Sequence, residues 1–211
     1  MKKDFDLLVY GCGGHARSII NTALEKYSPQ KILLVDDNVK EKEFILGCRT
    51  LANWNNQEKI PFIVAVGDNE RRQTLFMQKC LNGEKPVSII SETASIGINT
   101  VIERGAFVAK KVCLGPEVRV GRNSIVNTGS IIDHETNIGI NTHIAPGTTI
   151  CGRCRIGDNV FIGAGCVIKD NIKIGDNVII GAGAVVIRDI VESGVYVGVP
   201  ARKIKEGVKI C

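Results

Sequence analysis

One hydrophobic position recurs every six residues through the second half of the chain, and its register never slips. Counted in blocks of six from Ile90 to the block that starts at Val186, the first residue is always Ile, Leu or Val. The fifth residue is small or β-branched, and the second is often glycine. A repeat this regular over about one hundred residues constrains the fold more than any other feature of the sequence.

A period of six fits neither an amphipathic helix, with its period of 3.6, nor a hairpin ladder. A β-sandwich needs turns of variable length and would not keep one register for so long. The pattern predicts a β-helix in which each block forms one short strand and one corner, with coils stacked about 4.8 Å apart. The first and fifth residues would fill the interior, and the glycines would ease the corners. A composition of 23 glycines and only 5% aromatic residues fits such a narrow interior.

The composition excludes several classes of function. The net charge of +5 is modest, so we do not expect a nucleic-acid partner. No apolar run approaches the roughly 20 residues of a membrane span, and the N-terminus lacks the apolar core of a signal peptide. We therefore expect a cytoplasmic protein with reduced thiols and no membrane partner.

Eight cysteines raise the question of a metal site. Cys151 and Cys154 have the spacing of metal ligands, but no second pair or nearby histidine completes a set of four. Both residues also fall at positions that the repeat explains. We expect no metal.

The first part of the chain has a different pattern. An apolar run at 5–10 precedes a glycine-rich segment and a helical pattern, and further strands are expected at 32–35 and 62–66, with a second helical stretch to about residue 81. This order predicts a small βαβαβ domain, one half of a doubly wound parallel sheet, with its ligand site at the carboxyl ends of the strands. We place this domain at residues 1–88 and the β-helix with a short tail at 89–211.

The glycine-rich segment nearly matches a dinucleotide fingerprint, with Gly11, Gly13 and Ala16 in place. The domain is too short for the second half that a dinucleotide such as NAD needs. One half of a dinucleotide-binding domain favours a smaller ligand, a mononucleotide or a nucleotide-linked sugar. Backbone N–H groups of Gly13 and Gly14 at a helix N-terminus would bind it.

The six-residue blocks and the ending Gly198-Val199-Pro200-Ala201-Arg202-Lys203 resemble the hexapeptide-repeat acyltransferases. That resemblance implies a left-handed parallel β-helix with 18 residues per coil, about five to six coils here, and acetyl-CoA as co-substrate. It also makes Arg202, Lys203 and Lys205 candidates for the phosphates of CoA.

The string Gly11-Cys12-Gly13-Gly14-His15-Ala16 in front of such a repeat resembles a narrower group, the NeuD/PglD-like bacterial sugar acetyltransferases. In that family the N-terminal domain holds the nucleotide sugar. The positions that match it here are Gly13, Gly14, His15, Asp36, Asp37 and Gly67.

The chain has three histidines, and two of them lie on the repeat. His134 and His143 both fall off the interior positions, so we expect both to project outward. They are nine residues apart, half of an 18-residue coil, and should therefore point in roughly opposite directions. A neighbouring copy of the chain is needed to bring them into one site, which predicts a homotrimer with clefts between subunits.

The resemblance also assigns roles to these residues. His134 matches the general base of the family, and Glu135 matches the carboxylate that tunes it, with Asp133 as a less favoured substitute. His143, Ala164 and Ala182 match positions along the acetyl-CoA groove. A histidine base suits acyl transfer because its ordinary pKa lies near neutral pH.

These residues predict an acetyl-CoA-dependent N-acetyltransferase of a UDP- or dTDP-linked 4-amino-4,6-dideoxy sugar, for surface glycans such as lipopolysaccharide. One alternative is an O-acetyltransferase of sialic acid. Two others belong to different classes, a non-catalytic β-helix scaffold and a carbonic anhydrase on the same fold. The last needs three histidine ligands, whereas the repeat carries two.

Overall fold

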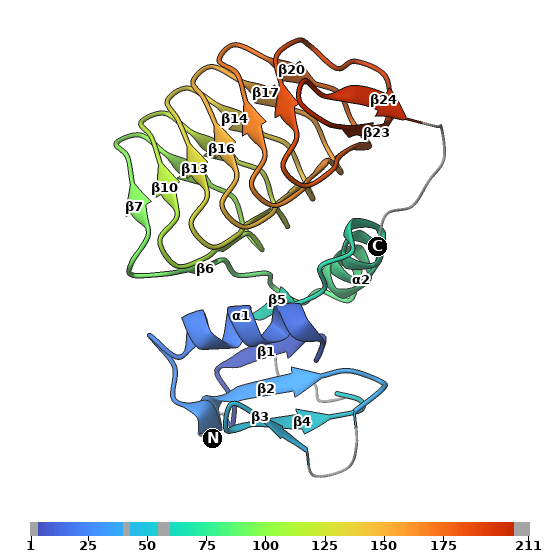
Figure 1. Cartoon of the computed structure of the whole chain (residues 1–211). Helices are drawn as coiled ribbons and strands as arrows, with labels where there is room; N and C mark the ends of the chain where they lie inside the picture. Colours follow the sequence, from blue (N-terminus) through green and yellow to red (C-terminus); the bar gives the residue numbers. More distant parts are fainter. Residues whose placement is uncertain (1–3, 40–42, 55–59, 205–211) are drawn as a thin grey trace.

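The computed structural model describes residues 4–39, 43–54 and 60–204. It consists of a small α/β part and a parallel β-helix, joined at residue 89 by the start of the first coil (Figure 1). The predicted fold class is confirmed. Lys205, a candidate for CoA binding, lies outside the described residues.

The N-terminal part is built around a five-stranded sheet with the order β3-β4-β2-β1-β5. Strands β4, β2, β1 and β5 are parallel, and β3 is antiparallel to β4. Its elements are β1 (Leu7–Tyr10), α1 (Gly14–Ala23), the 3-10 turn η1 (Pro29–Lys31), β2 (Ile32–Val35), β3 (Phe44–Ile45), β4 (Cys48–Leu51), β5 (Phe62–Val64) and α2 (Asn69–Leu81). Since β2 and β5 lie on opposite sides of β1, the sheet has its switch point between β1 and β5.

The hairpin β3–β4 was not predicted from the sequence. In the described residues it lies between β2 and β5, where a βαβαβ order would have its second helix. Between the second and third expected strands the described chain turns back at Leu46-Gly47, two residues with positive φ. This is the backbone of a two-residue hairpin turn, which usually carries Asn-Gly or Asp-Gly. With leucine in the first place, the signal was not visible in the sequence.

The β-helix has three faces, each a sheet of stacked short strands. The first face contains β6 (Ile89–Ile90), β9 (Phe107–Val108), β12 (Ile125–Val126), β15 (His143–Ile144), β18 (Phe161–Ile162), β21 (Val178–Ile180) and β23 (Gly194–Val197), and it ends in the antiparallel β24 (Arg202–Ile204). The second face contains β7 (Ser95–Ile96), β10 (Cys113–Leu114), β13 (Ile131–Ile132), β16 (Thr149–Ile150), β19 (Val167–Ile168) and β22 (Val185–Val186). The third face contains β8 (Val101–Ile102), β11 (Arg119–Val120), β14 (Asn137–Ile138), β17 (Arg155–Ile156) and β20 (Lys173–Ile174).

From β6 to β22 neighbouring strands pair in parallel with residues 18 positions apart, as Cys113 with Ile131 and Ile125 with His143, whereas β21 and β23 pair with residues 16 apart. The coil length that the resemblance implies is therefore confirmed. The first residue of every block from Val108 to Val186 is at most 4% exposed. Ile96 is 42% exposed because it lies in the first coil, which has no coil below it.

The fifth residue of many blocks also bonds the coil it faces. The hydroxyls of Ser124 and Thr142 donate to the carbonyls of Gly139 and Gly157, each 15 residues ahead. Cys154 occupies the same place, with its sulfur 3.2 Å from the carbonyl of Lys169. The repeat thus explains the buried cysteine of the Cys151–Cys154 pair.

The corners depend on the fourth residue of each block, which the sequence analysis did not single out. From Asn99 to Gly183 this residue has a φ between 56° and 79° in every block, and most of these residues are Asn or Gly, the types that tolerate the left-handed conformation. The second-position glycines have another role than the expected one. A Cβ on Gly121 would lie 2.6 Å from the carbonyl carbon of Gly139, so these glycines allow close approach of successive coils.

The α/β part packs on the first face of the β-helix, and α1 lies between its own sheet and the first coils (Figure 1). Ile19 and Ile20 of α1 share one buried cluster with Ile89 and Phe107. No helix in the described ranges is long and apolar enough to cross a membrane.

Candidate active site

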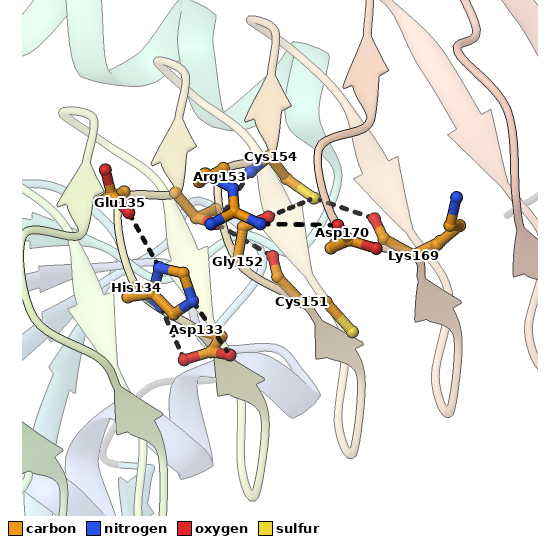
Figure 2. A network of polar contacts seen from close by, with 10 residues as sticks. Asp133, His134, Glu135, Cys151, Gly152, Arg153, Cys154, Lys169 and Asp170 are labelled. Carbon is orange, nitrogen blue, oxygen red and sulfur yellow. Dashed lines mark hydrogen bonds and ion pairs between the residues drawn. The ribbon is translucent and has the colours of Figure 1, made fainter.

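His134 lies at the corner between the second and third faces of the β-helix, directly after β13. Its Nδ1 is 3.0 Å from Oε2 of Glu135, and its Nε2 is 3.9 Å from Oδ2 of Asp133 (Figure 2). The imidazole side chain is 38% exposed, so a substrate can reach it. The two carboxylates differ in their relation to the ring, since Glu135 contacts one nitrogen and Asp133 lies near the other.

Local structure holds this ring in place. Oδ1 of Asp133 accepts a 2.8 Å bond from the backbone N–H of His134, which tightens the corner. Glu135 is the left-handed residue of the corner, with a φ of 58°. In the next coil, a Cβ on Gly152 would lie 2.5 Å from Cε1 and Nε2 of His134, so the ring rests on the backbone of that glycine.

Gly152 is therefore a site residue that sequence reasoning missed. The available signal was its position, 18 residues after His134, which in this fold means directly above it.

The contact with Glu135 determines which ring nitrogen of His134 carries the proton. A carboxylate accepts a hydrogen bond, so the contact places the imidazole proton on Nδ1 and leaves the lone pair on Nε2. An exposed imidazole with one nitrogen oriented by a carboxylate is the arrangement of a general base.

The loops predicted to hold a nucleotide sugar meet at the carboxyl ends of β1, β2 and β5. Gly13 and Gly14 lie at the start of α1, are exposed, and would have no atom within 4 Å of an added Cβ. Oδ2 of Asp36 accepts a 2.8 Å bond from the backbone N–H of Cys12 and so ties the end of β2 to the glycine segment. Asp37 is exposed beside it, and Gly67 follows β5. The structure thus gathers these residues at the switch point of the sheet, where ligands of such folds bind.

His15 and His143 come together at the boundary between the α/β part and the β-helix. Their ring centroids are 5.9 Å apart, and each ring also meets a phenylalanine edge-on, Phe107 for His15 and Phe161 for His143. His143 points away from the β-helix interior as expected, but it is only 8% exposed because the α/β part covers it. No pattern in the sequence indicates this pairing, because it depends on how the two parts dock.

Burial keeps both of these rings neutral. Desolvation, with Arg72 nearby, lowers the pKa of His15 to about 4 and that of His143 to about 3. Nδ1 of His143 is 3.2 Å from the carbonyl oxygen of Gly67, which can only accept, so the proton lies on Nδ1. The buried Nε2 is then a hydrogen-bond acceptor without a partner in the described structure, and a ligand group that fits it must be a donor.

The other predicted cofactor residues lie along successive coils. Ala164 and Ala182 are exposed at neighbouring corners between the first and second faces, and the N–H of Gly183 donates to the carbonyl of Ala164 at 2.9 Å. Arg202 and Lys203 border a cavity of about 170 Å³ at the last coil. His134 lies on a different corner, so one chain does not bring all of these residues together.

Two family models match the chain. The PglD N-terminal domain matches residues 6–79, and the bacterial transferase hexapeptide model of six repeats matches residues 135–170 and 153–188.

Several solved structures are similar over almost the whole chain. The acetyltransferase domain of PglB from Neisseria gonorrhoeae is 28% identical, with 94% of this chain and 98% of that chain covered and a TM-score of 0.86. A histidine-to-alanine variant of GDP-perosamine N-acetyltransferase from Caulobacter crescentus, solved with CoA and GDP-perosamine, is 26% identical, with 95% and 97% covered and a TM-score of 0.88. WeeI from Acinetobacter baumannii, at 22% identity, 95% and 100% coverage and a TM-score of 0.85, shares the fold.

The α/β part, the β-helix and the matches to both family models agree on one assignment. The α/β part matches the PglD N-terminal domain family, the β-helix matches the bacterial transferase hexapeptide family, and the chain is similar over almost its whole length to PglD-like sugar acetyltransferases.

Proposed function

We propose that this protein transfers the acetyl group of acetyl-CoA to the amino group of a nucleotide-linked 4-amino-4,6-dideoxy sugar, with His134 as general base. The observation that carries the proposal is the accessible His134 ring, held by Glu135 at 3.0 Å and resting on Gly152. A scaffold without catalysis would not need an exposed imidazole in this arrangement.

In the proposed reaction the sugar amine attacks the thioester carbonyl. A C–N bond forms, Nε2 of His134 takes the proton that the nitrogen loses, and the C–S bond breaks to release CoA, which leaves as the thiol after taking up a proton. Glu135 does not take the proton. It orients the ring and stabilises the imidazolium that forms.

The acceptor side of the proposal rests on the switch-point loops. Gly13, Gly14 and Gly67 offer backbone groups without side chains in the way, and the α1 N-terminus favours the diphosphate of a nucleotide sugar. The C. crescentus relative was solved with GDP-perosamine and CoA, a nucleotide-linked aminosugar and the spent acetyl carrier. We propose a UDP- or dTDP-linked sugar as acceptor and surface glycan synthesis, including lipopolysaccharide, as its use.

On the donor side we propose that acetyl-CoA lies along the corners that carry Ala164 and Ala182. Small side chains there leave the backbone of successive coils accessible to the pantetheine arm. The buried Nε2 of His143, an acceptor, suits an amide N–H of that arm better than the thioester carbonyl. Arg202 and Lys203 at the last coil are suited to the phosphates.

We further propose a homotrimer, because His134 and His143 lie on different sides of the β-helix. The second face offers a surface for the contact, since Ile131 is 46% and Val167 is 39% exposed there and Cys113 is exposed with them. His134 follows β13 at the edge of this face. A neighbour packed on it would place its own residues beside the base.

A substrate panel tests the proposal. Acetyl-CoA is offered with UDP-, dTDP- and GDP-linked 4-aminosugars and with free sialic acid, and CoA release is followed as free thiol. We expect release with an aminosugar nucleotide and an amide in the product. Release with sialic acid alone would replace N-acetylation by O-acetylation, and no release with any acceptor would contradict the enzyme proposal.

A further inference from the structure

Arg72 of α2 is the largest fully buried side chain of the described residues, at 1% exposure, and the reaction described above does not use it. All five N–H donors of its guanidinium are bonded. Nε donates to the carbonyl of Asn123, Nη1 to the carbonyls of Val66 and Gly67, and Nη2 to the carbonyl of Asn141 and to Oδ1 of Asn69.

These acceptors belong to two different parts of the molecule. The carbonyls of Val66 and Gly67 follow β5 in the α/β part, at the switch point. The carbonyls of Asn123 and Asn141 lie 18 residues apart, at successive corners of the β-helix. One planar group therefore connects the predicted acceptor loop with two coils of the domain that carries the base.

The asparagines around Arg72 extend the connection. Nδ2 of Asn69 donates to the carbonyls of Asn159 and Val160, and Nδ2 of Asn141 donates to the carbonyl of Asn69 at 2.8 Å. Asn141 also bonds Asn123 on one side and Asn159 on the other, side chain to side chain. The boundary is thus a polar network that joins the two parts through several bonds, although Oδ1 of Asn123 has no partner in the described structure.

The same network reaches a predicted ligand residue. The carbonyl of Gly67 accepts from Nη1 of Arg72 at 3.0 Å and from Nδ1 of His143 at 3.2 Å. The arginine thereby helps to set both the loop and the orientation of His143.

The chemistry of the site requires arginine. All five acceptors are neutral oxygens, and burial lowers the pKa of Arg72 to about 9, so the group remains charged at neutral pH. A lysine has the charge but only three donors and no planar fork, and cannot serve five acceptors in two directions.

We propose that Arg72 is a positioning residue for acetyl transfer, which holds the acceptor loop after β5 at a fixed place on the β-helix and so sets where the bound sugar nucleotide meets the acetyl donor. This inference rests on the proposed function.

The test compares Arg72→Lys with Arg71→Lys. Arg71 is the adjacent, exposed arginine of the same helix and provides the same substitution without the network. Kinetics with acetyl-CoA and the best acceptor of the panel are measured on folded, oligomeric protein. For Arg72→Lys we expect the KM of the sugar nucleotide to rise at least tenfold, and the KM of acetyl-CoA to rise by a clearly smaller factor, because Arg72 reaches His143 only through the carbonyl of Gly67. Arg71→Lys should match the wild type in both.

A purely structural role predicts a different result. Loss of folded protein would lower the apparent kcat and leave both KM values unchanged. A folded Arg72→Lys enzyme whose KM for the sugar nucleotide lies within twofold of the wild type overturns the proposal.

Two further measurements cover the remaining outcomes. If Arg72→Lys does not fold, Asn69→Ala removes one acceptor of Arg72 and two bonds to the β-helix, and should raise the same KM about threefold to fivefold. An unchanged KM in that variant would overturn the proposal. If the wild type acetylates no acceptor, the proposed function fails, and amide hydrogen exchange of residues 66–69 still tests the loop. We expect these amides to exchange at least tenfold faster in Arg72→Lys, or in Asn69→Ala if Arg72→Lys does not fold, than in Arg71→Lys. Equal rates would refute the role of Arg72.

Discussion

At the scale of single residues, the candidate base could be predicted from the sequence, but the contacts that hold its ring in place could not. The place of His134 outside the interior positions followed from the six-residue register, and Glu135 followed from the resemblance. Contact with Gly152 needed the coil geometry, because only stacking brings residues 18 positions apart into contact. The pairing of His15 with His143 needed the docked α/β part, which no local pattern encodes.

Gly152→Ala tests whether the ring position matters. The new Cβ would lie 2.5 Å from the imidazole and must displace it, whereas the backbone of Gly152 does not have a positive φ and accepts alanine. We expect a loss of kcat on the order of tenfold or more, because a misplaced catalytic group costs up to about 10²-fold. Arg153→Ala, an exposed neighbour, is the control and should retain most of the activity. Equal kcat values for wild type and Gly152→Ala would show that catalysis does not depend on the contact between the His134 ring and Gly152.

The buried histidines predict how stability depends on pH. In the folded chain the pKa values of His15 and His143 are about 4 and about 3, against an ordinary value near 6.5. Below about pH 6.5 the unfolded chain therefore binds more protons than the folded one, and the free energy of unfolding falls as the pH decreases. Each histidine contributes up to about 1.4 kcal/mol per pH unit.

Urea unfolding between pH 7 and pH 5 measures this dependence above the range in which most carboxylates titrate. His143→Gln should flatten the slope relative to the wild type. The same slope in both proteins would mean that His143 is protonated in the folded state.

At the scale of elements, the six-residue repeat predicted the strands and the positions buried in the interior. The corners follow a second sequence pattern. The block register identified the buried positions from Val108 onward because burial repeats with the coil. The left-handed conformation of the fourth residue was also encoded, as an excess of Asn and Gly at that position. The hairpin β3–β4 was missed because its turn has leucine where asparagine is usual.

The corner asparagines differ in what they bond, and this difference can be measured. Asn141 is fully buried, has a φ of 56°, and its Nδ2 donates to Asn69 and Asn159. Asn141→Ala should cost about 2–5 kcal/mol, from about 1–2 for the left-handed conformation and about 1–3 for unpaired buried groups. Asn177→Ala, at an exposed corner with a φ of 57°, is the matched control and should cost only the first part. Equal free energies of unfolding for the two variants would show that the buried network adds no stability.

At the scale of the whole molecule, the three faces of the β-helix have different surroundings. The α/β part covers the first face from β6 to the start of β18. The second face exposes apolar side chains, and the third carries the exposed charges of Arg119, Arg155 and Lys173. The sequence predicted the need for a neighbour but not the face that would receive it, because that choice depends on where the N-terminal part docks.

If the second face is the contact between copies, charges placed on it should separate them. Ile131→Asp combined with Val167→Asp should shift the protein from trimer to monomer at micromolar concentration and abolish acetyl transfer, while the circular dichroism spectrum stays unchanged. Arg119→Asp on the third face should remain trimeric. Sedimentation velocity measures both, and a trimer in the double variant would place the contact elsewhere.

The proposed reaction requires His134 to accept the proton of the attacking amine. The decisive measurement is kcat of folded, oligomeric His134→Ala at saturating acetyl-CoA and sugar nucleotide. A positioned base contributes about 10²–10⁴ in rate, so we expect a loss of that order with an unchanged dissociation constant for CoA. Glu135→Gln should fall between this variant and the wild type, because it orients the ring without taking the proton. A loss of less than about threefold in His134→Ala would exclude His134 as the base and place the base elsewhere.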